Sequence, residues 1–358
     1  MQLSIAVIPG DGIGPEVISH TTAILNRICE LYGHKFQYKH LLAGGCAIDA
    51  YGTALPEQTL RICKQSDSIL MGPVGGWKWD NLPGDCRPET ALTGLREQLE
   101  LFANLRPISL YDSFINSCVL RPEILRNGFE MLIVRELTGG IYFGESGRRQ
   151  TEDGEAAFDT MIYSEKEIRR IATVAFRLAR LRKRHLTSID MANALESSRL
   201  WRLTVSSIAK DYPDITIDHL YFDTAVTQLL LDPGFFDVIV TANMFGGIFS
   251  EQAAQITGSI ELFPSACMGE SGTFGLYHPI HGAAPELAGA DIANPIATIL
   301  SAAMMLRYSF ALVEEAEAIE NAVISTLDAG FRTSDIMSHG MTPVNSFGLC
   351  RQIISRII

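Results

Sequence analysis

The sequence predicts an α/β fold with largely parallel strands, divided between two domains or lobes. Short β-branched runs alternate with longer amphipathic stretches, which is typical of strands that are connected by helices. The chain has 358 residues, more than one ordinary hydrophobic core accommodates. With 47% hydrophobic and 20% charged residues, it buries enough apolar surface to fold without disulfides.

The first predicted elements are a buried strand and the helix that follows it. Leu3 to Ile8 is an apolar run that ends at Pro9 and Gly10. A helix is expected from about Pro15, because proline suits the first turn of a helix.

Ser164 and Glu167 form a capping-box pattern that predicts the start of a second helix. The apolar residues after this pattern recur at helical spacing on one face: Ile168, Ile171, Ala172, Ala175 and Ala179. A strand is expected next, around Leu186 to Ile189. The basic run from Arg177 to Arg184 ends the helix, where cations suit the helix dipole, so we interpret it as structural.

The next predicted unit has a strand near Ile215 to Phe222 and another at Phe236 to Val240. We expect a loop from Thr241 to Gly247, and helix again after about Ser250. No internal repeat, low-complexity segment or Pro/Ser-rich linker marks a domain boundary.

Composition excludes several classes of partner. A formal net charge of -12 argues against binding a nucleic-acid backbone. The seven cysteines are odd in number and lack metal-site spacing, so we expect reduced, mostly buried thiols. Neither a signal peptide nor an apolar run of about 18 residues occurs, which predicts a cytoplasmic protein without a membrane partner.

The segment from Pro9 to Glu16 resembles a dinucleotide-binding fingerprint, but its glycines are spaced G-x-G-x-G and a proline follows at once. Taken alone, it is equally well explained as a tight strand-to-helix turn. Four later segments make it more specific: Leu101 to Pro107, Arg135 to Gly144, Asn243 to Gly246, and His281-Gly282 through Asn294-Pro295.

Together, and in this order, these segments resemble the isopropylmalate/isocitrate dehydrogenase family, whose members are β-decarboxylating dehydrogenases. The sequence from Glu136 to Gly144 is similar to that of the 3-isopropylmalate dehydrogenase branch in particular. The resemblance covers nearly the whole chain, from Ile5 to about Arg332.

The resemblance implies an isocitrate/isopropylmalate dehydrogenase-like fold of two α/β lobes around a shared sheet, distinct from the Rossmann fold. Residues 1–101 plus 257–358 would form the first lobe, on the cofactor side. Residues 102–256 would form the second, with the dimerisation, substrate and metal sides. A homodimer with shared active sites is expected, in which NAD oxidises a 2-hydroxy dicarboxylate with a divalent metal.

Several residues match the family's substrate site. Arg96, Arg106 and Arg135 match its carboxylate clamp, and a guanidinium presents a fixed fork of donors to a carboxylate. Tyr142 matches the catalytic tyrosine that protonates the enol carbon, and Asp223 matches a substrate and metal residue. Glu89 and Leu92 match the pocket for the substrate's side chain. Thr93 stands where a second leucine is usual, which favours a smaller or more polar substituent.

The resemblance also places NAD. Gly76, Trp77 and Lys78 match the loop beside the nicotinamide. The loop around the adenosine half is matched by Gly282, Ala283, Ala284, Pro285, Glu286 and Asn294. Glu286 stands where NAD-using relatives carry an aspartate for the ribose hydroxyls, and an acidic group there repels a 2′-phosphate.

The departures from the family pattern fall on catalytic positions. Met191 replaces the lysine that takes the substrate's hydroxyl proton, and a thioether cannot relay a proton. Of three metal-binding aspartates, Asp223 is kept, Gly247 replaces one and Glu251 replaces another, so weakened Mg²⁺ or Mn²⁺ binding is expected. Thr224, Ala242 and His278 are further departures. His278 could act as a substitute base, although a structural histidine is the favoured interpretation.

Three functions remain open. The first is a protein of this family that binds NAD and a 2-hydroxy dicarboxylate, with the ordinary oxidative decarboxylation strongly impaired or redirected by a degenerate active site. The second is a working NAD-dependent 3-isopropylmalate dehydrogenase of leucine biosynthesis, the branched-chain amino acid pathway. The third is a non-catalytic subunit that pairs with an intact paralogue in a hetero-oligomer.

Overall fold

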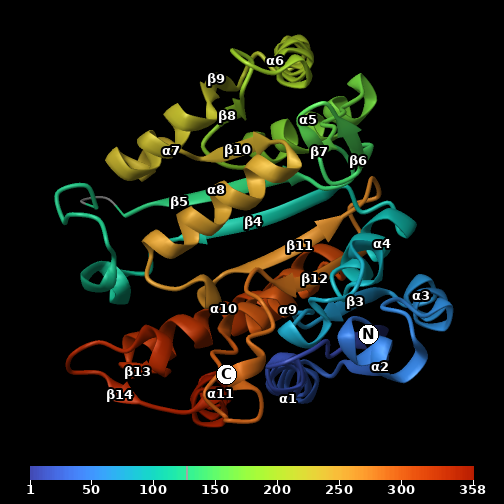
Figure 1. Ribbon diagram of the computed structural model, residues 1–358. Coiled ribbons are helices and arrows are strands. Elements are labelled where there is room, and N and C mark those ends of the chain that lie inside the picture. Colours follow the sequence, from blue (N-terminus) through green and yellow to red (C-terminus); the bar gives the residue numbers. More distant parts are fainter. Residues whose placement is uncertain (126–127) are drawn as a thin grey trace. The chain divides into compact units, whose positions relative to one another are not determined.

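The computed structural model describes residues 1–125 and 128–358, which form two compact units (Figure 1). Unit 1 comprises Met1–Leu101, Tyr111–Val119 and Ala254–Ile358, and unit 2 comprises Phe102–Leu110 and Leu120–Ala253. The cofactor and substrate roles assigned to the two lobes stay predictions. Among the described residues, no helix combines the length and apolar character needed to cross a bilayer.

The strands of unit 1 lie in the order β2-β1-β3-β12-β11. Their bounds are β1 Gln2–Ile8, β2 Lys35–His40, β3 Ser68–Met71, β11 Pro264–Met268 and β12 Gly275–Pro279. β1 pairs in parallel with β2 and β3, β12 pairs in parallel with β3, and β11 is antiparallel to β12. The predicted first strand is confirmed.

The helices of unit 1 cover these strands (Figure 1). Their bounds are α1 Gly14–Tyr32, α2 Gly45–Tyr51, α3 Glu57–Lys64, α4 Thr90–Gln98, α9 Ile296–Ser309, α10 Val313–Asp328 and α11 Ser346–Ile354. α9 packs on β11 and β12, and every residue from Ile296 to Leu306 is buried. Because α9 is apolar on all sides, it forms the centre of the core of this unit.

The turn between β1 and α1 contains the glycines of the first motif. Gly10 and Gly12 have φ angles of 75° and 56°, in the left-handed region that favours glycine. A Cβ on Gly12 would lie 1.9 Å from the backbone oxygen of Ala283, so only glycine allows this close approach. Pro15 lies in the first turn of α1, as predicted.

Asp11, in the same turn, joins three loops at the carboxyl ends of the strands. Its carboxylate accepts hydrogen bonds from the backbone N–H groups of Gly45 at 2.8 Å, Cys46 at 2.7 Å and Gly75 at 2.9 Å. The side chain is buried, and hydrogen bonds to a buried carboxylate are among the stronger ones in proteins. Asp11 therefore fixes the loop that leads into Gly76 and Trp77.

The strands of unit 2 lie in the order β4-β5-β10-β8-β9. Their bounds are β4 Ala103–Ser109, β5 Glu130–Glu136, β8 His185–Asp190, β9 Thr216–Tyr221 and β10 Val238–Thr241. β4 and β5 are antiparallel, whereas β5, β10, β8 and β9 are parallel. The strands predicted around Leu186, Ile215 and Phe236 are confirmed, within a few residues at their ends.

The helices of unit 2 are α5 Glu165–Arg180, α6 Glu196–Ala209, α7 Phe222–Leu231 and α8 Asn243–Ile256. The predicted capping box of α5 is confirmed, because Ser164 and Glu167 each accept from the other's backbone N–H. The structural interpretation of the basic run is also confirmed. Arg180 pairs with Asp214, and Arg182 pairs with Asp237.

The predicted loop from Thr241 to Gly247 is wrong, because α8 begins at Asn243. Gly246 and Gly247 suggested a loop, yet they lie in the first turns of the helix. The reason is the side chain of Arg135, which occupies the space beside them: a Cβ on Gly246 would lie 2.7 Å from its Cγ. These glycines make room for an arginine inside a helix–strand contact.

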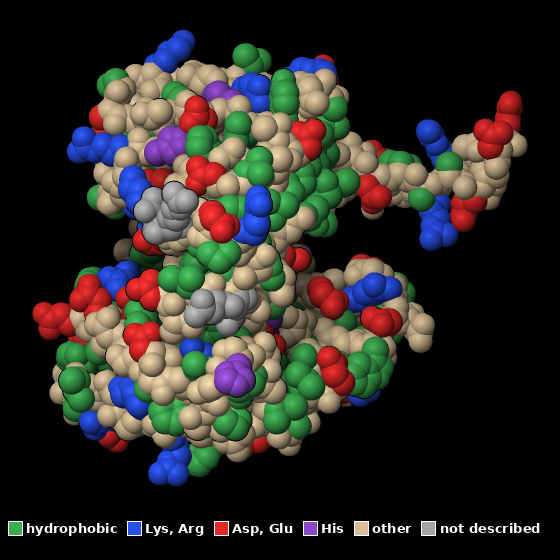
Figure 2. Space-filling model, turned by 90° about the vertical axis from the view of Figure 1, so that its left-hand side faces the viewer, with side chains coloured by type: hydrophobic (Ala, Val, Ile, Leu, Met, Phe, Trp, Pro, Cys, Tyr) green, Lys and Arg blue, Asp and Glu red, His purple; other side chains and the backbone are tan. Residues whose placement is uncertain are grey.

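A β-hairpin formed by β6 Ser146–Thr151 and β7 Gly154–Asp159 belongs to unit 2. Figure 2 shows it as an arm that carries cationic and acidic side chains along its length. Nearly every residue of both strands is exposed. An isolated two-stranded hairpin is marginally stable in water, so contact with a further surface would stabilise this arm.

A partly buried polar network in unit 1 involves Glu261, Asn294 and Asp335. The Glu261 carboxylate accepts from the backbone N–H of Asn294 at 3.2 Å, and the Asn294 side-chain amide donates to Asp335 at 3.0 Å. Burial, and then the nearby Asp335 charge, raise the pKa of Glu261 to about 7. This carboxyl group therefore changes its charge close to neutral pH.

The first prediction is a pH dependence of stability that comes from Glu261. Folding raises the pKa of Glu261 from 4.5 to about 7, so the protonated side chain adds to the free energy of unfolding. This contribution is fully present below about pH 4.5. That contribution is lost as the pH rises through 7. A Glu261→Gln variant, which mimics the protonated side chain, should be more stable than the unaltered protein by about 2–3 kcal/mol at pH 8.

The measurement is denaturant unfolding between pH 4 and pH 8. The difference between the two proteins should shrink toward zero at pH 4, and a matched Glu270→Gln change at an exposed site should leave the profile unchanged. A constant difference at every pH would contradict the prediction.

Candidate active site

The predicted site residues of unit 2 gather at the carboxyl ends of its parallel strands. Arg135 is the second-last residue of β5, and Met191 directly follows β8. Asp223 and Asn243 lie two residues after the ends of β9 and β10. In open α/β sheets this edge is where ligands bind.

Arg106 and Arg135 lie on the same face of β4 and β5. In the antiparallel register Asn104 pairs with Arg135 and Arg106 pairs with Ile133, which makes the two arginines diagonal neighbours. Arg106 donates to the Ser250 hydroxyl at 2.6 Å and to the Asn104 side chain at 2.6 Å. Both guanidinium groups therefore lie beneath the first turns of α8.

Asn243, the first residue of α8, holds Arg135 in place. Its side-chain oxygen accepts from Arg135 Nη2 at 2.8 Å and from Nε at 3.1 Å. Its side-chain NH₂ group donates to the backbone oxygens of Leu137 at 3.0 Å and Gly139 at 3.3 Å. One buried amide thus orients the arginine and the loop that leads to Tyr142.

Gly247 lies directly against the Arg135 guanidinium. A Cβ at this position would lie 3.3 Å from Arg135 Cζ, Nη1 and Nη2. Glu251 is four residues further along α8, on the same helix face, and its side chain is exposed. An aspartate at 247 would therefore bring a carboxylate next to the Arg135 guanidinium.

Tyr142, the predicted catalytic tyrosine, is 60% exposed in the turn that follows β5. A second tyrosine, Tyr163, is buried. Its hydroxyl oxygen accepts a hydrogen bond from the Asn243 backbone N–H at 2.8 Å. Burial, and then the Glu136 carboxylate, raise the pKa of Tyr163. The role of Tyr163 is therefore to support the loop, and Tyr142 is the tyrosine that reaches solvent.

Met191, which replaces the family's lysine, lies next to a neutralised carboxylate. Asp190 is buried and forms a two-pronged ion pair with Arg202, at 2.9 Å and 2.8 Å. It also accepts from the Ala192 backbone N–H at 2.9 Å. Since Asp190 is fully occupied in this way, it cannot take over the lysine's task.

The predicted metal residues of unit 2 provide only two carboxylates. Asp223 is exposed at the start of α7, where its side chain accepts from the Thr224 backbone N–H at 2.7 Å. Glu251 is the second, and Gly247 offers no ligand. Mg²⁺ is commonly bound through one or two carboxylates, waters and substrate oxygens, and Asp223 and Glu251 offer ligands of that type.

In unit 1, the substrate residues share one face of α4. Glu89 is the N-cap residue of this helix, and Leu92, Thr93 and Arg96 follow at helical spacing. The Thr93 hydroxyl donates to the backbone oxygen of Thr90 at 3.2 Å. Because the hydroxyl hydrogen is already bonded within the helix, Thr93 acts here mainly as a small side chain with a methyl group.

Arg96 is buried, and its Nε atom has no hydrogen-bond partner among the described residues. Its Nη2 lies 3.3 Å from Nε2 of His278 on β12. His278 Nδ1 lies 2.7 Å from the backbone oxygen of Pro279, which fits an Nδ1–H donor and leaves Nε2 to accept from Arg96. His278 is thus a buried partner of Arg96, and the structural interpretation of this histidine is favoured.

The predicted cofactor residues form two loops of unit 1. Trp77 and Lys78 lie in a single 3₁₀ turn, Trp77–Trp79, which the Asp49 side chain anchors through Lys78 and Trp79. Gly76 has a φ of 150°, and a Cβ there would crowd Trp79 at 3.2 Å and Pro285 at 3.6 Å. The glycine is therefore required for this turn.

The second loop runs from Gly282 to Asn294. Ala283 accepts from the Ile13 backbone N–H at 2.8 Å, whereas Gly282 and Glu286 face solvent. Glu286 has no hydrogen bond or ion pair with any described residue, so its carboxylate is free to accept hydroxyl donors. A hollow of about 440 Å³ lies beside this loop, lined by Ile292, Ser334, Met337, Pro343, Val344 and Asn345. These features fit a nucleotide.

The residues that support the site are not predicted from the sequence. Asn243 belongs to a motif, but its contact with Arg135 is not among the predictions, and neither Tyr163 nor Asp49 is a predicted site residue. The signal available in the sequence was a polar residue directly after a buried strand, as at Asn243. Tyr163 and Asp49 carry no such signal, because their partners are distant in the chain.

Comparisons with known proteins agree with this arrangement. The family model described as isocitrate/isopropylmalate dehydrogenase matches residues 4–353. A protein named 3-isopropylmalate dehydrogenase from Methylococcus capsulatus is 52% identical over 359 residues, covering 100% of this chain and 99% of its own. One of the same name from Nitratidesulfovibrio vulgaris is 50% identical over 358 residues and covers 100% of both chains.

Solved structures agree as well. An isocitrate dehydrogenase from Methylococcus capsulatus has a TM-score of 0.87 at 30% identity and covers 99% of both chains. The apo form of a β-decarboxylating dehydrogenase from Thermococcus kodakarensis has a TM-score of 0.79 at 31% identity, covering 99% of this chain and 96% of its own. The predicted fold class is confirmed, and the chain belongs to the isocitrate/isopropylmalate dehydrogenase family of oxidoreductases.

Proposed function

We propose that the chain is an NAD-dependent 3-isopropylmalate dehydrogenase, which oxidises and decarboxylates its substrate in leucine biosynthesis. The observation that carries this proposal is full-length similarity, at about half identity, to several proteins of that name. The retained arginines support it. Arg106 and Arg135 are neighbours in unit 2, and the buried Arg96 has an Nε donor without a partner.

In the proposed reaction the arginines bind the substrate carboxylates, and Leu92 and Thr93 contact its side chain. NAD, when bound, accepts the hydride from the hydroxyl carbon. A solvent water takes the hydroxyl proton in place of the missing lysine, because Met191 and the paired Asp190 cannot. Tyr142 protonates the enol carbon after carbon dioxide leaves. Asp223 and Glu251 would hold Mg²⁺ or Mn²⁺, which polarises the substrate oxygens.

A second candidate function is a protein of the same family whose ordinary reaction is strongly impaired or redirected. Met191 and Gly247 favour it, because a positioned general base contributes about 10²–10⁴ in rate and Gly247 removes a metal ligand. Nothing among the described contacts or the comparisons favours a non-catalytic subunit of a hetero-oligomer.

The second prediction separates these two functions by steady-state kinetics with 3-isopropylmalate, NAD and Mg²⁺ or Mn²⁺. If the proposed function is right, the unaltered protein turns over within the ordinary range of about 1–10³ s⁻¹. Met191→Lys and Gly247→Asp, alone or together, should then raise kcat less than about tenfold, because the water relay already suffices.

If the second candidate function is right, the unaltered protein should have a much lower kcat. The double variant should then raise kcat by about 10²–10⁴. Malate and tartrate should be assayed beside 3-isopropylmalate, since a redirected enzyme would prefer one of them. No NADH from any substrate with any of the four variants would contradict both functions.

The third prediction concerns the choice of cofactor. The free carboxylate of Glu286 suits ribose hydroxyls and repels a 2′-phosphate, so NADH should bind at least tenfold more tightly than NADPH. Calorimetric titration of both decides this. Glu286→Gln should narrow the preference, Glu270→Gln should not, and equal affinities in the unaltered protein would contradict the assignment.

The fourth prediction is a homodimer, which the exposed β6–β7 hairpin supports. A second copy of the chain would pair with or cover the hairpin, and Phe158, 37% exposed on β7, would become buried. Light scattering at micromolar concentration should give twice the chain mass of 39.3 kDa. Phe158→Asp should weaken the dimer, whereas the matched change Phe347→Asp at an exposed site of unit 1 should not. A monomer at these concentrations would contradict the proposal.

A further inference from the structure

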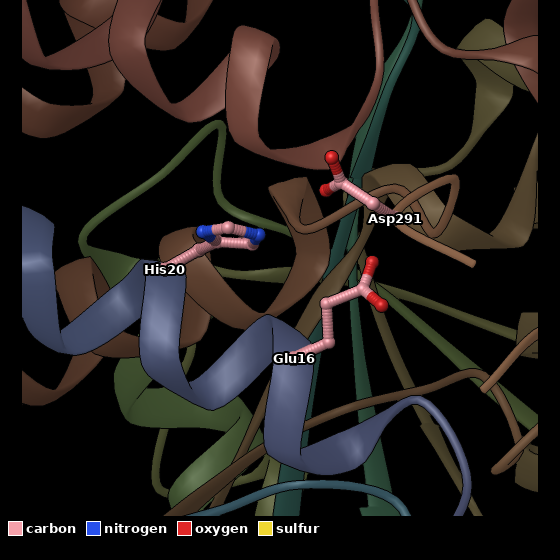
Figure 3. A group of neighbouring side chains, drawn as sticks. All are labelled: Glu16, His20 and Asp291. Atoms are coloured by element: carbon pink, nitrogen blue, oxygen red, sulfur yellow. The ribbon is translucent and has the colours of Figure 1, made fainter. Parts of the chain in front are cut away.

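A cluster of metal-binding side chain types lies in unit 1, apart from the residues discussed above. Figure 3 shows Glu16 and His20 on successive turns of α1, facing Asp291 on the segment that leads into α9. Each side chain offers one ligand atom, and these atoms all lie within 4.8 Å of one another. The i, i+4 spacing of Glu16 and His20 puts both on one helix face.

A second observation is the unsatisfied histidine nitrogen. Nε2 of His20 is buried and has no hydrogen-bond partner among the described residues. Figure 3 shows the outer edge of the ring turned toward the two carboxylates.

The two carboxylates are held by neighbouring donors. The Ser346 hydroxyl donates to Glu16 at 2.6 Å, and the Phe347 backbone N–H donates to Asp291 at 3.0 Å. The Asn345 side chain donates to the other Asp291 oxygen. Such outer donors are typical of metal sites, where they orient the ligands.

From this geometry we propose that Glu16, His20 and Asp291 form a binding site for a divalent transition metal of the Zn²⁺ type. One imidazole nitrogen and two carboxylate oxygens suit Zn²⁺ or Co²⁺, whereas Mg²⁺ and Ca²⁺ prefer oxygen ligands alone. Metal–ligand bonds of about 2.0–2.2 Å require the three atoms to approach each other by small side-chain rotations. Water completes the coordination.

Binding at this site would join α1 to the segment from Ala283 to Ala293. The two already pack together through Ile13, Val17, Ala293 and Leu287, and Asp291 holds a left-handed φ of 55°. The same segment is assigned to the adenosine half of NAD, so any effect on NAD affinity rests on the proposed function. Metal binding itself does not.

The test is calorimetric titration of the full chain with Zn²⁺, without substrate or NAD and in millimolar Mg²⁺, which occupies oxygen-only sites. We expect the unaltered protein to bind one Zn²⁺ per chain at this site. The affinity of the site for Zn²⁺ should be at least tenfold weaker in His20→Gln and in Asp291→Gly. Titration with Co²⁺ should give a visible absorption band that both variants lose. Matched changes elsewhere in unit 1, His40→Gln and Glu30→Gln, should keep full binding.

Asp291→Gly also limits the risk of misfolding, because glycine accepts a φ of 55° without strain. Zn²⁺ should raise the melting temperature of the unaltered protein and not that of this variant. If the unaltered protein, the two ligand variants and the two controls bind Zn²⁺ alike, the proposal is wrong. An enzyme that is inactive yet binds Zn²⁺ here would overturn only the proposed function.

Discussion

The geometry of the candidate site in unit 2 depends on one buried side chain, Asn243. Its oxygen takes both donors of the Arg135 fork, and its NH₂ group holds the backbone that leads to Tyr142. Its backbone N–H is satisfied by Tyr163. An unsatisfied buried polar group costs about 1–3 kcal/mol, so loss of this amide would release several groups at once. Unit 1 relies on Asp11 in a similar way.

Both residues are located by the same constraint, the common direction of parallel strands. Residues that directly follow β5, β8, β9 and β10 are distant in sequence, yet they emerge at one edge of the sheet. Asp11 follows β1 and binds the loops after β2 and β3. The chain therefore needs no long-range recognition to gather polar side chains at these edges. Once the apolar strands pair, their carboxyl ends place the polar residues.

This constraint also explains which features the sequence predicts well. The strand before Pro9, the helix from Pro15 and the capping box at Ser164 depend on residues a few positions apart, and all three are confirmed. The start of α8 was predicted wrongly because Gly246 and Gly247 favour a loop by local rules. These glycines are needed because the Arg135 side chain packs against them, and Arg135 lies more than one hundred residues earlier in the chain. The partnership of His278 with Arg96 was out of reach for the same reason.

The replacements at the catalytic positions have an electrostatic consequence within unit 2. The resemblance implies carboxylates at 242 and 247, where this chain has alanine and glycine, whereas Arg106 and Arg135 are kept. Without an aspartate at 247, this position of α8 adds no carboxylate of its own beside the Arg135 guanidinium, from which a Cβ would lie 3.3 Å away. Position 247 therefore contributes neither a charge that competes with a substrate carboxylate for Arg135 nor a ligand for a divalent ion. Under the proposed function, substrate binding by the arginines is thus compatible with a loosely held metal ion, because a glycine at 247 favours the first and weakens the second.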